Sequence, residues 1–408
     1  MSLTSGSTSP AAIRKAEASD NEIDLLNSKY RGFSCAQEGV DEAFLGLVAA
    51  TYARETTRIF LDRYLPELTR RGNGLVGLLE NWLNRDIPFE TVWDPAVSNT
   101  FRAIQTGSVE DAVNHAAVLA LRLSASGVTG EWSLALAKPM RLQWGRWLLP
   151  SADRLDVVCA RTAASVRAHL GDTHHEVIFT LTGDGWQADG AAALPQFGTQ
   201  HQKITLLPVP ELAAKNLGAF DDLLPVADEM PPEVTLVCHE TIELLTAYSP
   251  IYLPWVLRVI RYLIPLNETT GIQSGSVEDQ FGVVCAALGP NSVPLAESFV
   301  HEASHQHLNL LCRLGPIDDG TDSNLYYSPV ARKERPLNRI VVAYHAFANL
   351  LLFYRLLRAN GISDDAYCAQ KEAELISQVE DLESPLRTSR ALTSIGRGLC
   401  DPLIERVH

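Results

Sequence analysis

The stretch His301-Glu302-Ala303-Ser304-His305 decides how this chain is interpreted, because its HExxH spacing places two imidazoles on adjacent turns of a helix. Residues i and i+4 of an α-helix share a face, so both rings can reach a single metal ion. Glu302 lies beside them and can polarise a metal-bound water or orient a ligand. The flanking residues predict a helix, since no Gly or Pro occurs from residue 295 to residue 314. The stretch therefore predicts a metal-binding helix, and the alternative is a solvated helix whose histidines are incidental.

A catalytic metal needs a third protein ligand beyond two histidines. His307 lies roughly 200° around the helix from His305 and cannot share the ion. His345 is the better candidate, because it is an isolated His in the apolar segment 341–354 and needs a partner when buried. Its alternative role is that of a core His bonded to a backbone carbonyl or a Tyr hydroxyl. Four carboxylates of the connecting loop stay open as alternative ligands: Asp318, Asp319, Asp322 and Glu334.

Bulk properties limit the class of protein. The 408 residues are 46% apolar and 20% charged, which is typical of a globular protein large enough for two or three subdomains. The formal net charge of −15, without a basic stripe, argues against a nucleic-acid partner. Seven dispersed cysteines without a CxxC pair favour reduced thiols in a cytoplasmic enzyme. No apolar run approaches a membrane span and no signal peptide is visible, so we expect no membrane association.

The pattern of apolar, polar and turn-forming residues predicts four segments. Residues 1–20 form a flexible tail, and residues 21–127 form a helical module with apolar residues at three- and four-residue steps. Residues 128–230 are β-rich, with short apolar runs separated by turn residues. Residues 231–408 form a helical metal-site region, which begins with a helical hairpin that ends at Pro265 and includes one strand over residues 281–288. We therefore expect an α+β fold that is mostly helical, with a β-rich middle segment and an HExxH helix next to the helix that carries the third ligand.

The loop after the HExxH helix carries a second group of candidate residues. Its polar turn residues end in Tyr326-Tyr327-Ser328-Pro329, and Arg332 and Arg335 follow near the start of the next helix. The planar guanidinium of an Arg binds a carboxylate through two parallel hydrogen bonds. Either Arg is therefore a candidate for binding an acidic ligand, and the alternative is a pair of solvated charges.

Four blocks of the sequence, taken in order, resemble a known family. The blocks are His301-Glu-Ala-Ser-His305, Tyr326-Tyr-Ser-Pro329, Arg335-Pro-Leu337 and the helix over residues 344–354. Together they resemble the HExxH-type, alpha-ketoglutarate-dependent peptide beta-hydroxylases, which are tailoring enzymes of ribosomally made, post-translationally modified peptides. The good match covers about residues 280–357, and the first hundred residues carry no motif that matches.

The resemblance implies Fe(II) at the histidine pair, with 2-oxoglutarate and O₂ as cosubstrates for hydroxylating the β-carbon of a residue in a precursor peptide. It implies His301, His305 and His345 as ligands, and Arg335, then Arg332, for the 2-oxoglutarate carboxylate, with Tyr327 in the same element. Three protein ligands leave three positions on octahedral iron, two for 2-oxoglutarate and one for O₂. The usual triad contains one carboxylate, so the loop carboxylates stay open.

Two other functions compete with this one. A zinc metallopeptidase would use Glu302 as its general base, and motif logic alone favours it. A non-catalytic protein that binds the peptide would keep the fold without the chemistry. Metal analysis would separate the three functions. Iron with 2-oxoglutarate turnover indicates the hydroxylase, zinc with peptide cleavage indicates the peptidase, and no stoichiometric metal indicates the binding protein. The precursor peptide is the expected partner, and a homodimer is the candidate assembly.

Overall fold

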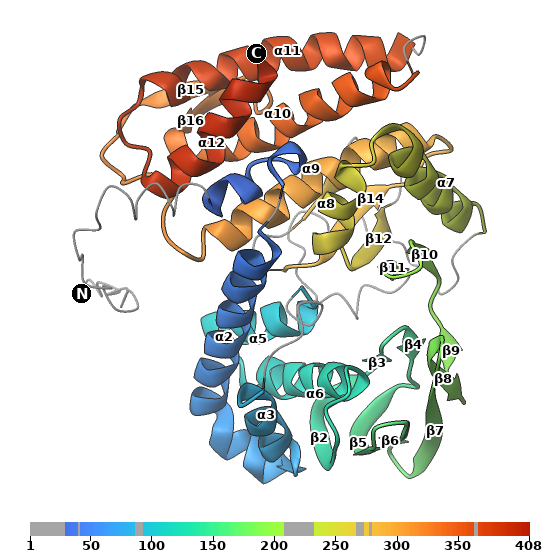
Figure 1. Cartoon of the computed structure of the whole chain (residues 1–408). Helices are drawn as coiled ribbons and strands as arrows, with labels where there is room; N and C mark the ends of the chain where they lie inside the picture. The colour runs from blue at the N-terminus through green and yellow to red at the C-terminus, as the bar shows by residue number, and fades with distance from the viewer. Residues whose placement is uncertain are drawn as a thin grey trace.

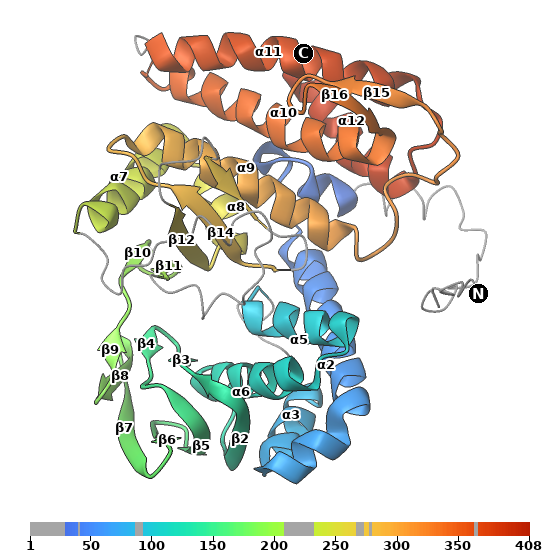
Figure 2. The ribbon, with the colours of Figure 1, turned by 180° about the vertical axis from the view of Figure 1, so that it is seen from behind.

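The computed structural model describes residues 29–39, 41–85, 93–207, 232–266, 273–276, 280–362 and 366–408. It has the α+β fold that the sequence predicts. Figures 1 and 2 show two lobes, one built mainly from residues 42–193 and one mainly from residues 196–408. The tail predicted for residues 1–20 lies outside the described residues.

The first lobe packs helices against an antiparallel sheet. Its helices are α2 (Glu42–Arg71), α3 (Leu75–Leu83), α5 (Pro95–Thr106) and α6 (Val109–Ala125). The sheet has the order β1-β2-β5-β6-β7-β8 and is formed by Gly72–Asn73, Gly130–Met140, Ala152–Cys159, Ala163–Leu170, Thr173–Thr182 and Gly185–Asp189. A small sheet of β3 (Gln143–Trp144), β4 (Trp147–Leu148) and β9 (Ala192–Ala193) lies beside it. Along β5 and β6, alternate residues are buried, as expected for a sheet with one face on the core.

The second lobe contains the HExxH helix and a mixed sheet. The sheet has the order β10-β11-β12-β14-β13, formed by Gln196–Gly198, Lys203–Leu206, Tyr262–Leu266, Val283–Ala287 and Ser274–Gly275. Strands β11, β12 and β14 are parallel, and the two edge strands are antiparallel to them. The helices are α7 (Pro232–Tyr248), α8 (Tyr252–Val259), α9 (Ser292–Leu311), α10 (Leu337–Ala359), α11 (Ala366–Thr388) and α12 (Ser394–Val407). A hairpin of β15 (Leu325–Ser328) and β16 (Lys333–Pro336) precedes α10.

One predicted element of the second lobe is wrong and two are confirmed. The predicted helical hairpin ends early, because α8 stops at Val259 and Tyr262–Leu266 forms the central strand β12, buried along its whole length. A strand covered on both faces is continuously apolar, so its periodicity does not separate it from a buried helix. The strand predicted over residues 281–288 is confirmed as β14, and the HExxH helix is confirmed as α9.

Helix α9 is held in place at its start and along its back. The Asn291 side chain caps it by accepting a hydrogen bond from the backbone N–H of Val293 at 3.0 Å. Farther along, the buried Gln306 side chain accepts a hydrogen bond from the N–H of Gly282 at 3.1 Å, just before β14 begins. Gly282 has φ of 83° and lies against the Trp93 carbonyl, which a Cβ atom would meet at 2.0 Å. The contact with Trp93 requires glycine at position 282, and the Gln306 hydrogen bond ties α9 to the start of β14.

The described chain begins in the second lobe, which the sequence did not predict. The 3₁₀ turns η1 (Arg31–Phe33) and η2 (Ala36–Glu38) lie beside α9 and α12, and the long helix α2 then runs into the first lobe (Figure 1). Ser34 donates its hydroxyl hydrogen bond to the Leu399 carbonyl at 2.6 Å, and Arg406 pairs with Glu38 at 2.6 Å. The first described segment is therefore part of the wall behind the HExxH helix.

Helix α10 is long and apolar enough to cross a membrane by length and composition alone, and 72% of its most apolar stretch is buried inside the protein. It packs against α9, α11 and α12. Its apolar character is therefore that of a core helix in a packed lobe.

Candidate metal centre

The two histidines of the HExxH stretch face one another on α9. Their Nε2 atoms are 3.0 Å apart, and the ring planes meet at 87° with centroids 4.6 Å apart. Both side chains are partly exposed, and the Phe347 ring from α10 lies 5.6 Å from the His301 ring. In this arrangement one Nε2 donates a hydrogen bond to the other.

The separation of the two Nε2 atoms fits ligation of one ion. Nitrogens about 2.1 Å from one ion and at a right angle to each other lie about 3.0 Å apart, whereas a tetrahedral angle places them about 3.4 Å apart. The observed 3.0 Å is the length of an N–H···N hydrogen bond, and it is short enough for both nitrogens to reach one ion. Desolvation, followed by the neighbouring His301 and His345, holds the pKa of His305 well below its usual value. The ring is neutral at pH 7, as a metal ligand must be.

His345 lies close enough to His301 and His305 to interact with them electrostatically, but its Nε2 is hydrogen-bonded to backbone carbonyls. The side chain is fully buried, and its Nε2 donates to the carbonyls of Phe33 at 2.9 Å and Ser34 at 2.8 Å. Burial lowers the pKa of His345 to about 4, so the ring stays neutral. The Asn349 amide also donates to the Ser34 carbonyl, at 2.8 Å. His345 thus has the partners of a core His, and it anchors the first described segment against α10.

The loop carboxylates are mostly committed to local hydrogen bonds. Asp319 accepts from the hydroxyl and N–H of Thr321, and Glu334 lies on β16 opposite Tyr327. Asp322 accepts from two hydroxyl groups, those of Tyr326 at 2.7 Å and Ser389 at 2.6 Å, which with the Asn324 N–H lower its pKa to about 2. Asp318 accepts from the Gly320 N–H and is the one member of the set that lines the cavity of His305. Within the described ranges, no group of three His, Cys, Asp or Glu residues is arranged to hold an ion.

The Glu302 side chain points toward the sheet and is hydrogen-bonded there. Glu302 is buried, with 2% of its surface exposed. Its two carboxylate oxygens accept hydrogen bonds from Ser274 at 2.8 Å and Ser276 at 2.6 Å. These serines lie in and just after the edge strand β13. The observed contacts make Glu302 a link between α9 and β13, and both of its oxygens already have donors.

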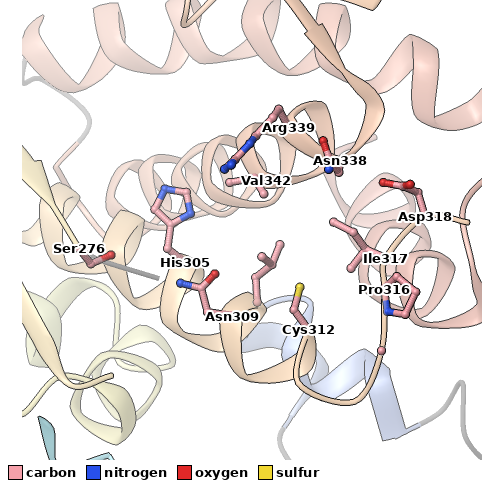
Figure 3. Close-up of a pocket in the computed structure, with 12 residues that line it drawn as sticks. Ser276, His305, Asn309, Cys312, Pro316, Ile317, Asp318, Asn338, Arg339 and Val342 are labelled. Atoms are coloured by element: carbon pink, nitrogen blue, oxygen red, sulfur yellow. The ribbon is translucent and has the colours of Figure 1, made fainter. Parts of the chain in front are cut away.

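Each histidine of the pair lines its own cavity. His305 lines a cavity of about 390 Å³ between α9 and α10 (Figure 3). His301 lines a second cavity of about 340 Å³, together with Phe347 and Lys371. Both volumes fall in the range of small-molecule sites. The pair therefore lies between two spaces, each large enough for part of a ligand.

A polar stripe runs along α9 through both cavities. Glu297, His301, His305 and Asn309 follow at four-residue steps, so they share one face of the helix. The Glu297 carboxylate accepts hydrogen bonds from Tyr354 at 2.7 Å, Tyr367 at 3.1 Å and Lys371 at 3.4 Å. Burial and Glu297 raise the pKa of Tyr367 to about 12, which keeps its hydroxyl protonated. Glu297 is thereby fixed one turn before His301.

The residues predicted to bind 2-oxoglutarate lie on the β15–β16 hairpin. Tyr327 is 56% exposed, Arg335 is opposite Tyr326 on the paired strand, and Arg332 has the left-handed φ of 49° in the turn. Among the described residues, those that line the His305 cavity do not include Arg332, Arg335 or Tyr327. The cation that does line it is Arg339, in the first turn of α10.

Asn309 and Arg339 are among the residues around this cavity that were not predicted from the sequence. Asn309 could have been found, because it continues the four-residue spacing of the HExxH histidines. Arg339 could not, because its direction depends on where the hairpin ends and α10 begins. The motif spacing thus predicts which residues of α9 line the cavity, whereas the residues that α10 contributes depend on tertiary packing.

No protein-family model matches this chain, and no curated protein matches it either.

Proposed function

We propose that this protein is an Fe(II)/2-oxoglutarate-dependent oxygenase that hydroxylates the β-carbon of a residue in a ribosomally made precursor peptide, in the cytoplasm. The observation that carries the proposal is the histidine pair with a cavity on each side. A reaction of two organic substrates at one ion needs space for both beside that ion. The resemblance of the four sequence blocks to the peptide hydroxylases supplies the substrate class.

In this proposal His301 and His305 supply two ligands of the ion through their Nε2 atoms, and the described residues bring no third protein ligand to them. When bound there, Fe(II) supplies dioxygen activation coupled to oxidative decarboxylation of 2-oxoglutarate to succinate and CO₂. The protein contributes two imidazoles on one face of α9, and the buried residues behind α9 keep the pair in position.

The contacts of Glu302 favour the oxygenase over the zinc peptidase. A general base must direct a carboxylate oxygen at the metal-bound water. Both oxygens of Glu302 instead accept hydrogen bonds from Ser274 and Ser276. In the oxygenase Glu302 needs no role in proton transfer, and its hydrogen bonds to β13 and Ser276 give it a structural role.

The experiment is turnover by the full-length protein loaded with Fe(II) under nitrogen and then given O₂ and 2-oxoglutarate. We expect succinate, and with the peptide encoded by a short neighbouring reading frame we expect a mass increase of one oxygen atom. Glu302→Gln should retain most succinate formation, because the amide can still accept from a serine. Zinc-dependent cleavage of the peptide that is lost in Glu302→Gln would instead identify a peptidase. Peptide binding without metal or turnover would identify a binding protein.

A further inference from the structure

The cavity beside His301 carries an excess of negative charge. Helix α9 contributes Glu297 to its walls, and helix α11 contributes Lys371 and Glu374. Glu374 lies three residues after Lys371 on the same face of α11, so its carboxylate offsets the ammonium charge. Among the described residues of this lining, two carboxylates therefore face one ammonium, and a cationic ligand is favoured over an anionic one.

Glu297 has a carboxylate oxygen that can accept a further hydrogen bond. Its Oε2 accepts from the hydroxyls of Tyr354 at 2.7 Å and Tyr367 at 3.1 Å. Its Oε1 has, among the described residues, the Lys371 ammonium at 3.4 Å as its donor. Each carboxylate oxygen has two lone pairs, so Oε1 can accept from one more group. Because Glu297 is 13% exposed and lines the cavity, a donor inside the cavity can reach it.

Ser298 supplies a hydroxyl that has no hydrogen-bond partner among the described residues. Ser298 is 6% exposed and lines the same cavity, three positions before His301 on α9. Polar side chains that are buried in folded proteins are nearly always hydrogen-bonded. This hydroxyl is therefore an observation, independent of the charges, that points to a ligand with a hydrogen-bonding group in the cavity.

The remaining wall of the cavity is apolar and suits an aliphatic chain. Phe347 and Leu350 from α10 and Leu375 from α11 line it. Lys and Arg side chains bury their methylene stems along apolar surfaces, while the charged head stays with polar groups. The face of an aromatic ring also attracts a cation. A basic side chain therefore matches both the apolar and the acidic part of this cavity.

We propose that the His301 cavity binds a Lys or Arg side chain of the peptide substrate, so that the protein prefers peptides with a basic residue; this inference rests on the proposed function. Glu297 and Glu374 accept hydrogen bonds from the ammonium or guanidinium group, and the Ser298 hydroxyl accepts another. The net charge of −15 attracts a basic peptide before it binds. These contacts need no metal, since side chains of α9, α10 and α11 make all of them.

The test is calorimetric titration of metal-free, full-length protein with two capped pentapeptides of alanine. One peptide carries lysine at its centre, and the other carries norleucine, which has a similar stem without the charge. We expect the lysine peptide to bind about tenfold more tightly, because only the ammonium group makes charge-assisted hydrogen bonds. Glu297→Gln should remove most of this preference. Glu374→Gln should lower it about threefold, because Glu374 is exposed and solvent weakens its interactions.

Glu380→Gln is the matched control, because Glu380 is an exposed carboxylate of α11 outside the cavity lining. It should keep the full preference for lysine, which separates a local effect from a change in net charge. Glu374→Gln leaves the contacts of Glu297 in place, so it tests the cavity without disturbing the buried network. Equal binding of the two peptides by the unmodified protein would overturn the inference. An unchanged preference in both Glu297→Gln and Glu374→Gln would overturn it as well.

Titration with n-butylammonium distinguishes a peptide side chain from a free amine. If n-butylammonium binding depends on Glu297 while the two peptides bind equally, the ligand is a free amine and the assignment to the peptide is wrong. The proposed function fails in a different way, through absence of succinate formation with iron and 2-oxoglutarate. A lysine preference that depends on Glu297 and Glu374 would still establish the cavity as a site for a basic side chain.

Discussion

Helices α9 and α10 carry histidines in two contrasting environments. His301 and His305 are partly exposed, face each other at 3.0 Å and line cavities. His307 and His345 are fully buried, and their Nε2 atoms lie 2.8 to 3.3 Å from backbone carbonyls. The His307 ring is also stacked on Trp255, with centroids 3.6 Å apart. The partner of the ring nitrogen, rather than burial or motif alone, therefore distinguishes a candidate ligand from a core histidine.

Replacement of His345 by Ala should give the largest stability change among these histidines. The variant loses the hydrogen bonds to Phe33 and Ser34 and leaves a cavity, so we expect a loss of about 2–4 kcal/mol in unfolding free energy. His301→Ala and His305→Ala should each stay within about 1 kcal/mol, because their rings face cavities rather than the core. Urea denaturation of the metal-free proteins measures the difference.

A second variant of His345 tests whether this residue is the third ligand. His345→Gln keeps an N–H donor for the two carbonyls and should recover part of the stability. If His345→Gln folds normally and yet loses iron, His345 is a ligand after all, and the division between the two kinds of histidine breaks down.

A smaller effect is expected from pH. An unfolded His has a pKa near 6.5, whereas burial lowers that of His345 to about 4 in the folded protein. Between these values the unfolded chain binds more protons, so stability must fall as pH decreases from about 6.5 toward 4. At pH 5 this one residue contributes a loss of about 2 kcal/mol. Desolvation lowers the pKa of His307 in the same direction.

The measurement is urea unfolding of metal-free protein between pH 7 and pH 5. His345→Gln should show a shallower pH dependence than the unmodified chain, because one proton fewer is linked to unfolding. Equal slopes in the two proteins would mean that His345 titrates normally and is not held in the core as its contacts indicate.

The contrast also shows what the sequence can predict. The α9 helix and its paired imidazoles follow from local spacing, which depends only on helix geometry. The environment of His345 does not, because its partners Phe33 and Ser34 are more than 300 residues away along the chain. The alternative of a core His bonded to a carbonyl was open from the sequence, and it matches the observed contacts.

The opposite wall of the site illustrates the same limit. The Tyr326–Pro329 and Arg335–Leu337 blocks were matched as a linear pattern, and the structure places them in and next to a hairpin. The cavity instead receives Arg339, four residues later, because α10 starts at Leu337 and turns that side chain toward α9. The spacing of residues along the sequence predicts which side chains share one face of a helix. It does not predict which side chains from other elements line the same cavity.

The most direct measurement is the iron content of protein reconstituted anaerobically with Fe(II) and freed of excess metal. We predict one iron per chain for the unmodified protein and for His239→Ala, a control that removes an exposed histidine of α7. We predict loss of stoichiometric iron in His301→Ala and in His305→Ala, with circular dichroism unchanged. Full iron occupancy in both of these variants, or an equal loss in His239→Ala, would contradict the assignment of the metal to the histidine pair.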